Sequence, residues 1–434
     1  MTSSQASRAE SELLDALQQE AFSYFQHETN PVNGMVIDKT GADWPASIAA
    51  VGLGLSCYPI AVERGWITRS AAVQVTLATL RFFALSAQGS EPDATGYRGF
   101  YYHFLDMQSG RRAHGSEIST VDTALFLAGA LAAAAYFTRS AGDEQEIREL
   151  ADALYRRVDW QWAQNGQAAV AQGWLPESGF VDYRYQGYDE ALILYLLGLG
   201  APANALSVTS YSAWASSYEW KRVHDIDFLY AGPLFTHQLS HIWIDFRGIQ
   251  DAFTREKGID YFENSRRATC IQQRYAIANP LNLRGYGEFA WGITASDGPG
   301  DATVRVDGVD RRFYDYIARG VPFGPDDGTL APWAVVASLP FAPDIVLPTI
   351  ERLDQQPLRG DHPYGFSSTF NPTFPGQSGG PRGWVSPFHF GLAEGPIMLM
   401  IENYRSGLIW ELMRRCPYLT TGLKRAGFSG GWLA

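Results

Sequence analysis

The sequence has few cysteines, and they lie far apart. Cys57, Cys270 and Cys416 are the only three in 434 residues, and their spacing fits neither a metal site nor a disulfide framework. We expect them to be small buried hydrophobic residues. The sequence also lacks a dinucleotide-binding fingerprint, a phosphate-binding loop and a serine nucleophile elbow. We therefore expect no metal and no cofactor.

Positive charge is scarce as well. The 34 lysines and arginines are outnumbered by 46 aspartates and glutamates, which gives a formal net charge of -12. A nucleic-acid-binding protein presents a positive surface to the phosphates, so we expect no nucleic-acid partner. The longest apolar run, residues 125–137, is shorter than the roughly 18 residues that cross a bilayer. We expect no membrane partner either.

The N-terminal stretch MTSSQASRAESELL has no apolar core and no basic start. It does not predict a secretory signal peptide. For the chain as it stands we expect a cytoplasmic protein. A periplasmic protein trimmed at its N-terminus would have the same sequence.

Strand patterns are almost absent, whereas apolar residues recur at helical spacing along most of the chain. A hydrophobic content of 46% is sufficient for a full globular core. The spacing predicts helices over residues 13–25, 48–62, 68–85, 117–136, 143–162, 190–199, 211–222, 237–244, 249–277, 333–339, 344–353 and 396–414. One strand is predicted, at residues 303–306, with no obvious partner.

Two neighbouring helices differ in pattern in a way that indicates the fold. The helix 117–136 is apolar nearly all round, whereas the helix 143–162 is apolar on one face and begins with a predicted capping box of Asp143 and Glu146. Alternating buried and half-buried helices are expected of an inner and an outer helical ring. We therefore expect an all-α fold, a single (α/α)6 toroid over residues 1–434 with long cleft-lining loops. Two helical domains divided near Asn279 are the alternative.

Residues 173–200, GWLPESGFVDYRYQGYDEALILYLLGLG, combine polar side chains with aromatic rings. The polar groups are Glu177, Asp182, Gln186, Asp189 and Glu190, and the rings are Trp174, Phe180, Tyr183, Tyr185 and Tyr188. Hydrolysis of a glycosidic bond requires one carboxylic acid for the leaving oxygen, a second carboxylate for water, and ring faces for the sugar. Helix capping explains single residues such as Asp189, but it does not explain the whole group.

Other carboxylates stand in unusual positions. Glu117 and Asp122 lie at the start of the buried helix in SEISTVDTAL, and a carboxylate there is costly unless it is paired or functional. Glu288 lies close to Trp291 in a second carboxylate–aromatic cluster. Glu394 lies in the predicted loop 360–395, which could face a cleft.

Two histidines one helical turn apart have the spacing of a zinc-binding motif. His237, His241 and Asp245 fall one helical turn apart in HQLSHIWID, but Gln238 stands where a zinc protease has glutamate. Because no third strong ligand is evident, we expect these side chains to form hydrogen bonds instead.

Four stretches carry a family resemblance: ESGFVDYRYQGYDEALILYLLGLG, YAGPLFTHQLSHIWIDFRGIQD, YFENSRRAT and GYGEFAWGITASDGPG. With them, residues 117–410 resemble the bacterial glucoamylase-like family, which includes glycoside hydrolase family 144, the β-1,2-glucanases. The resemblance implies an (α/α)6 barrel. It implies an anomer-inverting hydrolase whose partner is an oligo- or polysaccharide of β-1,2-linked glucose, with no prediction of oligomeric state.

Several functions remain as alternatives to this one. They are a transglycosylase on β-1,2-glucan, a glucoamylase-like α-glucan hydrolase, a non-catalytic sugar-binding protein and, less favoured, a lyase for uronic acids.

The resemblance also suggests roles for residues. It implies Glu190 as the general acid and Asp122 as the base, with Asp189 and Glu288 as alternative bases. The residues implied as lining sugar subsites are Glu117, Glu177, Asp182, Tyr188, His237, Trp243, Arg247, Trp291 and Glu394.

Overall fold

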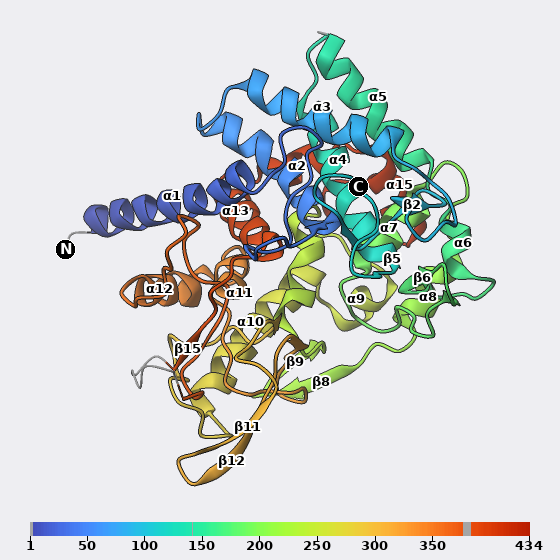
Figure 1. Cartoon of the computed structure of the whole chain (residues 1–434). Coiled ribbons are helices and arrows are strands. Elements are labelled where there is room, and N and C mark those ends of the chain that lie inside the picture. The colour runs from blue at the N-terminus through green and yellow to red at the C-terminus, as the bar shows by residue number, and fades with distance from the viewer. Residues whose placement is uncertain (1–2, 141, 376–382) are drawn as a thin grey trace. The chain divides into compact units, whose positions relative to one another are not determined.

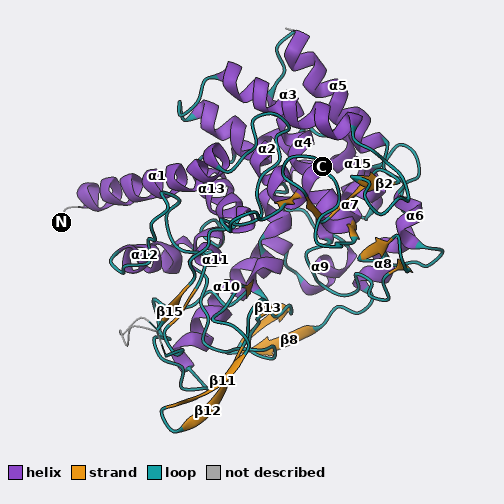
Figure 2. Ribbon diagram, in the orientation of Figure 1, coloured by secondary structure: helices purple, strands orange, loops and turns teal. Residues whose placement is uncertain are grey.

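The protein is mostly helical, with short strands between the helices (Figures 1 and 2). The structure is a computed structural model and describes residues 3–140, 142–375 and 383–434. Its residues group into two compact units. Unit 1 comprises Met1–Tyr24, Trp220–Leu239 and Phe262–Arg405, and unit 2 comprises Phe25–Glu219, Ser240–Tyr261 and Ser406–Ala434. The units interleave along the chain, and Asn279 falls inside unit 1, so they do not divide at the predicted alternative boundary.

Unit 2 contains most of the helices. They are α2 Ile48–Glu63, α3 Arg69–Leu85, α4 Thr120–Tyr136, α5 Gly142–Arg156, α6 Trp160–Gln164, α7 Leu192–Gly200, α8 Val208–Ala215, α9 Ala252–Lys257, α14 Leu408–Arg414, α15 Pro417–Arg425 and the 3-10 turn η3 Gly431–Leu433. An antiparallel sheet has the order β2 Gly96–Tyr97, β3 Phe100–Tyr102, β5 Ile118–Ser119, β6 Gly173–Leu175 and β7 Gly179–Phe180. A separate pair joins β1 Ala46–Ser47 to β4 Phe104–Leu105.

Unit 1 contains the remaining helices and four strand pairs. The helices are α1 Ser3–His27, whose last residues belong to unit 2, α10 Tyr261–Ala278, whose first residue belongs to unit 2, α11 Pro332–Ala337, α12 Pro343–Asp354 and α13 Gly391–Arg405. The pairs are β8 Trp220–Val223 with β9 Ile226–Leu229, β10 Ala295–Ser296 with β13 Ile317–Ala318, β11 Ala302–Val306 with β12 Val309–Phe313, and β14 Phe370–Asn371 with β15 Trp384–Val385. The turn η1 Leu234–His237 follows β9, and the next turn, η2 Leu239–Ile242, lies in unit 2 after its first residue.

The core of unit 2 is built on the close packing of α2 against α4. Both helices are buried along nearly their whole length, and the burial of α4 confirms the prediction from the all-round apolar pattern of residues 117–136. Glycine makes the approach possible, because a Cβ on Gly52 would lie 2.4 Å from Leu125 O and one on Gly129 would lie 1.9 Å from Gly52 O. This packing fixes the N-terminal end of α4, where Asp122 lies.

Several helix predictions are confirmed, and others are wrong at their ends. The helices predicted at 13–25, 48–62, 68–85, 333–339 and 344–353 all exist. The predicted helix 143–162 is instead α5 followed by α6, and its capping box is wrong. Asp143 and Glu146 lie inside α5 and accept hydrogen bonds from Gln74 and Arg81 of α3.

Two long predicted helices are each divided by a glycine. Gly258 separates α9 from α10, and Gly407 separates α13 from α14, both with positive φ (68° and 70°). A left-handed residue ends a helix, and the apolar spacing continues across it undisturbed. The helix α15 was not predicted.

Three further predictions need correction. The helix predicted at 211–222 ends at Ala215 and is followed by the strand β8, and the one predicted at 237–244 is only the short 3-10 turns. The strand predicted at 303–306 exists and pairs with β12, a partner the sequence did not reveal. The loop predicted at 360–395 contains β14 and β15 and ends where α13 begins; its residues 376–382 lie outside the described part of the chain.

Candidate active site

The register of the unit 2 sheet brings His103 beside Glu117. Tyr102 of β3 pairs with Ile118 of β5 in an antiparallel ladder, so the next pair along the ladder is His103 with Glu117. The backbone N–H of His103 donates to Glu117 O at 2.9 Å, and its Nδ1 lies 3.1 Å from Glu117 Oε1. Residues directly opposite in a sheet share one face. Here that face carries the carboxylate of Glu117 and the imidazole of His103.

Asp122 joins this pair from the first turn of α4. Ser119 caps the helix, accepting from the Asp122 N–H at 3.2 Å and donating its hydroxyl to Asp122 Oδ2. The other ring nitrogen of His103, Nε2, lies 3.6 Å from the same Asp122 Oδ2. The imidazole therefore lies between two carboxylates, those of Glu117 and Asp122.

This arrangement controls the charge of the imidazole. Burial alone would lower the pKa of His103, but the charges of Asp122, Glu117 and Asp38 and the hydrogen bond to Glu117 raise it to about 9. His103 is therefore a cation at neutral pH. Burial opposes ionisation of Glu117, yet the hydrogen bond and charge of His103 lower the pKa of that carboxyl. Burial raises the pKa of Asp38, which accepts from Trp44 Nε1 at 3.0 Å.

Two more carboxylates lie in the turn before α7. Glu190 lies in this turn and not in the helix where the sequence places it. Asp189 Oδ1 accepts from Trp214 Nε1 at 2.9 Å and from the Ala191 N–H at 3.0 Å. Burial and the neighbouring Glu190 charge raise the pKa of Asp189. Burial also raises the pKa of Glu190, and the charge of Asp122 adds to the rise. Glu190 and Asp122 thus belong to one electrostatic cluster.

The turn is supported by buried aromatic residues of the same unit. Tyr195 OH donates to Tyr185 O at 3.0 Å and accepts from the Val170 N–H at 3.0 Å. Tyr188 is buried and stacks on Tyr261, with ring centroids 5.7 Å apart. These rings hold the backbone that presents Glu190.

We define the carboxylate cluster as Asp38, His103, Glu117, Asp122, Asp189 and Glu190. Sequence reasoning identified Glu117, Asp122, Asp189 and Glu190 as candidates. It missed Asp38 and His103, because their place in the cluster depends on sheet register and not on any local motif. The signal available was a single histidine between aromatic residues in YYHFLD.

Other predicted residues of unit 2 lie in different settings. Glu177 is 56% exposed and forms a bidentate ion pair with Arg112. Asp182 is exposed. Trp243 is fully buried and donates to Ser56 Oγ at 2.9 Å. Arg247 pairs with Asp245 and lies 4.5 Å over the ring of Trp410.

The predicted residues of unit 1 are mostly core residues. His237 is buried, which lowers its pKa to about 4, and its Nε2 lies 3.3 Å from Ala231 O. Trp291 is buried and donates to Thr349 Oγ1 at 3.1 Å. Glu288 is exposed in a turn. Glu394 is not in a loop as predicted but in the first turn of α13, fully buried and 2.9 Å from His389 Nδ1.

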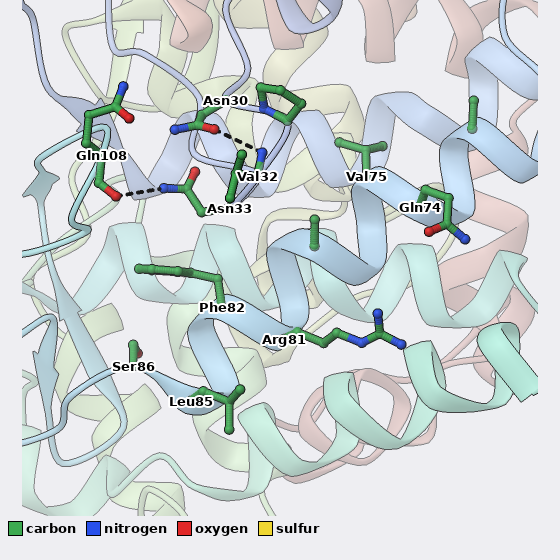
Figure 3. Close-up of a pocket in the computed structure, with 13 residues that line it drawn as sticks. Asn30, Val32, Asn33, Gln74, Val75, Arg81, Phe82, Leu85, Ser86 and Gln108 are labelled. Carbon is green, nitrogen blue, oxygen red and sulfur yellow. Dashed lines mark hydrogen bonds between the residues drawn. The ribbon is translucent and has the colours of Figure 1, made fainter.

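Unit 2 also carries a surface groove of about 890 Å³ beside α3 (Figure 3). The side-chain amides of the groove form hydrogen bonds with the backbone. Asn30 Oδ1 accepts from the Val32 N–H at 2.9 Å, and Asn33 Nδ2 donates to Met107 O at 3.0 Å. Its rim includes the exposed side chains of Val32 and Leu85. No carboxylate is among the described residues that line the groove, so it lacks the groups for acid–base catalysis.

The described residues contain neither a metal-binding cluster nor a membrane-spanning helix. Within residues 3–140, 142–375 and 383–434, no three His, Cys, Asp or Glu side chains are grouped so as to hold a metal ion. Over the same residues, no helix has the length and apolar character needed to cross a membrane.

Comparison with known proteins places the chain in a family. Residues 182–417, more than half of the chain, match the sequence model of the family described as "Putative glucoamylase". The chain belongs to this family. A curated relative is the exo β-1,2-glucooligosaccharide sophorohydrolase (non-reducing end) of Parabacteroides distasonis, 29% identical over 453 residues that cover 95% of this chain. The chain spans 57% of that relative's length.

Two solved structures of similar proteins cover nearly the whole chain. A "putative glucoamylase" from Bacteroides uniformis has a TM-score of 0.85 and 29% identity, over 98% of this chain and 99% of its own. An endo-β-1,2-glucanase from Chitinophaga pinensis, solved with sophorotriose and glucose, has a TM-score of 0.84 and 25% identity, over 98% and 99%. The glucoamylase-like chain therefore resembles β-1,2-glucan-cleaving proteins along its length.

Proposed function

We propose that the protein is a glycoside hydrolase that cleaves β-1,2-glucan or β-1,2-gluco-oligosaccharides, with Glu190 as its general acid. The observation that carries the proposal is the raised pKa of Glu190 within the carboxylate cluster. A general acid has to hold its proton near neutral pH, and burial next to another carboxylate is the usual means. The names of the Parabacteroides and Chitinophaga relatives supply the substrate class.

Asp122 is the proposed base. It is the carboxylate whose charge acts on Glu190, and its Oδ2 is held by Ser119 and lies 3.6 Å from the cation of His103. His103 offsets the repulsion of several carboxylates in one place. Asp189 is less suited to this role, because its Oδ1 already accepts two hydrogen bonds that fix the turn. Glu288 stays a sequence prediction.

The proposed reaction is anomer-inverting. Glu190 donates its proton to the glycosidic oxygen as the C–O bond breaks, and Asp122 takes a proton from the water that attacks the anomeric carbon from the opposite face. Inversion at a β bond gives an α-configured sugar as the first product.

We further propose that residues 1–434 form a single catalytic (α/α)6 toroid, as the sequence predicts. Two observations support this: unit 2 holds the buried helices α2, α4 and α7, and the similar structures cover 98% of the chain. Three of the other residues that the sequence places in sugar subsites are exposed: Glu177, Asp182 and Arg247. Their side chains can therefore contact a sugar without any repacking of the core.

A product assay on linear β-1,2-glucan, with soluble starch in parallel, tests the function. The proposal predicts short β-1,2-linked products from the glucan and none from starch. ¹H NMR at early times should show the α anomer first. A first product in the β configuration would instead support a retaining enzyme or a transglycosylase.

The family description favours one second candidate, an α-glucan hydrolase of the glucoamylase type. Cleavage of starch without cleavage of β-1,2-glucan would support it and would overturn the proposed substrate.

A further inference from the structure

Unit 1 contains a small pocket that the proposed reaction does not use. It lies between the β10–β13 pair, α11 and the start of α13, and its volume is about 30 Å³. Asp297, Tyr316, Trp333, Ser368 and Phe390 are among its lining residues. A space of this size holds one or two water-sized groups but no sugar ring.

Strand register places the two main side chains of this pocket together. Ser296 of β10 pairs with Ile317 of β13 in an antiparallel ladder. The next residues along that ladder are Asp297 and Tyr316, so they lie opposite each other at its end. The buried Arg319 fixes this end, since its Nη1 donates to Ser296 O at 2.6 Å. The carboxylate and the ring are therefore held side by side by the backbone.

Asp297 and Ser368 are among the buried polar side chains of the pocket. Asp297 Oδ1 accepts from Thr369 Oγ1 at 2.7 Å, and its Oδ2 accepts from Ser386 Oγ. The hydroxyl of Ser368 is buried and has no hydrogen-bond partner among the described residues. A buried polar group in that state is costly unless a ligand or water satisfies it.

The apolar side of the pocket is aromatic. Trp333 is buried, whereas Tyr316 is 61% exposed. An exposed tyrosine ring beside a carboxylate and a hydroxyl offers an apolar face next to hydrogen-bonding groups, which suits the mixed surface of a pyranose.

We propose that this pocket binds one glucosyl residue of the glucan substrate, with its hydroxymethyl group inside and its ring against Tyr316. The hydroxyl of that group donates to Asp297 and accepts from Ser368. We assign the hydroxymethyl group to the pocket because it is the only exocyclic carbon substituent of the glucose ring and its size fits a volume of about 30 Å³. The substrate class rests on the proposed function.

The test is direct binding of methyl β-D-glucopyranoside and of its 6-deoxy analogue, measured by calorimetry. Wild type is compared with Tyr316→Ala and Ser368→Ala. Tyr404→Ala is the matched control, because Tyr404 is also a partly exposed tyrosine of unit 1 but lies on α13 outside the pocket. We expect Tyr316→Ala to weaken binding about ten-fold, Ser368→Ala to weaken it several-fold, and Tyr404→Ala to leave it unchanged.

The analogue tests the hydroxymethyl assignment. We expect wild type to bind it more weakly than the parent glucoside. In Ser368→Ala the difference between the two sugars should be smaller, because only the hydrogen bond to Asp297 remains to be lost. Equal binding of both sugars by wild type, or unchanged binding in Tyr316→Ala and Ser368→Ala, would overturn the proposal.

Hydrolysis of β-1,2-glucan by the same wild-type preparation separates the two claims. If the glucan is cleaved while both variants bind sugar normally, the pocket proposal fails and the proposed function stands. If the glucan is not cleaved but binding depends on Tyr316 and Ser368, the function fails and the sugar pocket stands.

Discussion

His103 Nε2 lies 3.6 Å from Asp122 Oδ2, and this contact links the sheet of unit 2 to the first turn of α4. The same imidazole contacts Glu117 through Nδ1. The His103 cation thus interacts with the carboxylates of Glu117, next to β5, and of Asp122, in α4. The charge of His103 is expected to matter for both stability and activity.

The first prediction concerns pH and His103. Its pKa is raised from 6.5 to about 9 by the surrounding carboxylates. The stability that this shift provides is fully present below about pH 6.5 and is lost as pH rises through about 9. Because the side chain is partly exposed, we expect a contribution of roughly 1–2 kcal/mol after solvent screening. Urea unfolding of wild type and His103→Gln from pH 6 to 10 measures it.

The variant keeps a hydrogen-bonding side chain but cannot be a cation. The difference in unfolding free energy between wild type and His103→Gln should shrink between pH 8 and 10, and the alkaline limb of the activity profile should change. A difference that is constant across this range would show that the charge of His103 has no such role.

The second prediction concerns the hydrogen bond from Trp214 Nε1 to Asp189 Oδ1, 2.9 Å long. Trp214→Phe removes this donor and leaves a buried carboxyl with one bond fewer, so we expect a loss of about 1–3 kcal/mol in stability. Because the next residue is Glu190, we also expect kcat to fall more than KM changes.

A matched control is present in the same unit. Trp160 is also fully buried, but its Nε1 has no hydrogen-bond partner among the described residues. Trp160→Phe makes the same reduction in size without removing a bond, and it should leave kcat close to wild type. Equal losses of kcat in both variants would mean that packing, and not the bond to Asp189, holds the turn.

Glu394 gives the third prediction. Burial raises its pKa to about 7, despite the hydrogen bond and charge of His389. A carboxyl whose pKa is raised on folding stabilises the fold below its unfolded value, near 4.5, and this stabilisation is lost as pH rises through about 7. The shift corresponds to a change on the order of 3 kcal/mol. Thermal unfolding of Glu394→Gln between pH 4.5 and 8 should show a flatter pH dependence than wild type.

Glu411→Gln, at an exposed position of α14, provides the comparison and should retain the wild-type pH dependence. If Glu394→Gln keeps that dependence too, Glu394 is not the titrating group.

The fourth prediction concerns Trp243, which the sequence places in a sugar subsite. The side chain is buried and bonded to Ser56, so Trp243→Phe should cost about 1–3 kcal/mol of stability through the cavity it leaves and the bond it removes. It should leave KM for a glucan within about two-fold. A large rise in KM with normal stability would restore its predicted place in a sugar subsite.

The helices could be predicted from the sequence because apolar spacing repeats wherever a helix buries one face. Their ends were harder, since Gly258 and Gly407 end helices by a left-handed backbone conformation that leaves the spacing unchanged. Short strands such as β5 were missed because two residues hold no periodic pattern.

Members of the carboxylate cluster could be selected from the sequence only where a carboxylate lay in or beside an apolar segment. Asp122 and Glu190 met that condition. His103 did not, because its partners Glu117 and Asp122 reach it through sheet register and a helix cap. The burial of Trp243 and Glu394 could not be predicted from the sequence, because an aromatic or acidic residue has no local signal that separates a core from a cleft.

The most direct test of the account is the rate of product formation from linear β-1,2-glucan by wild type and Glu190→Gln. Glutamine keeps the shape of the side chain but cannot donate the proton. We predict that kcat falls by about 10²–10⁴-fold, while binding of β-1,2-gluco-oligosaccharides and thermal stability stay close to wild type. A variant that still hydrolyses the glucan within a few-fold of the wild-type rate would contradict it and place the general acid elsewhere.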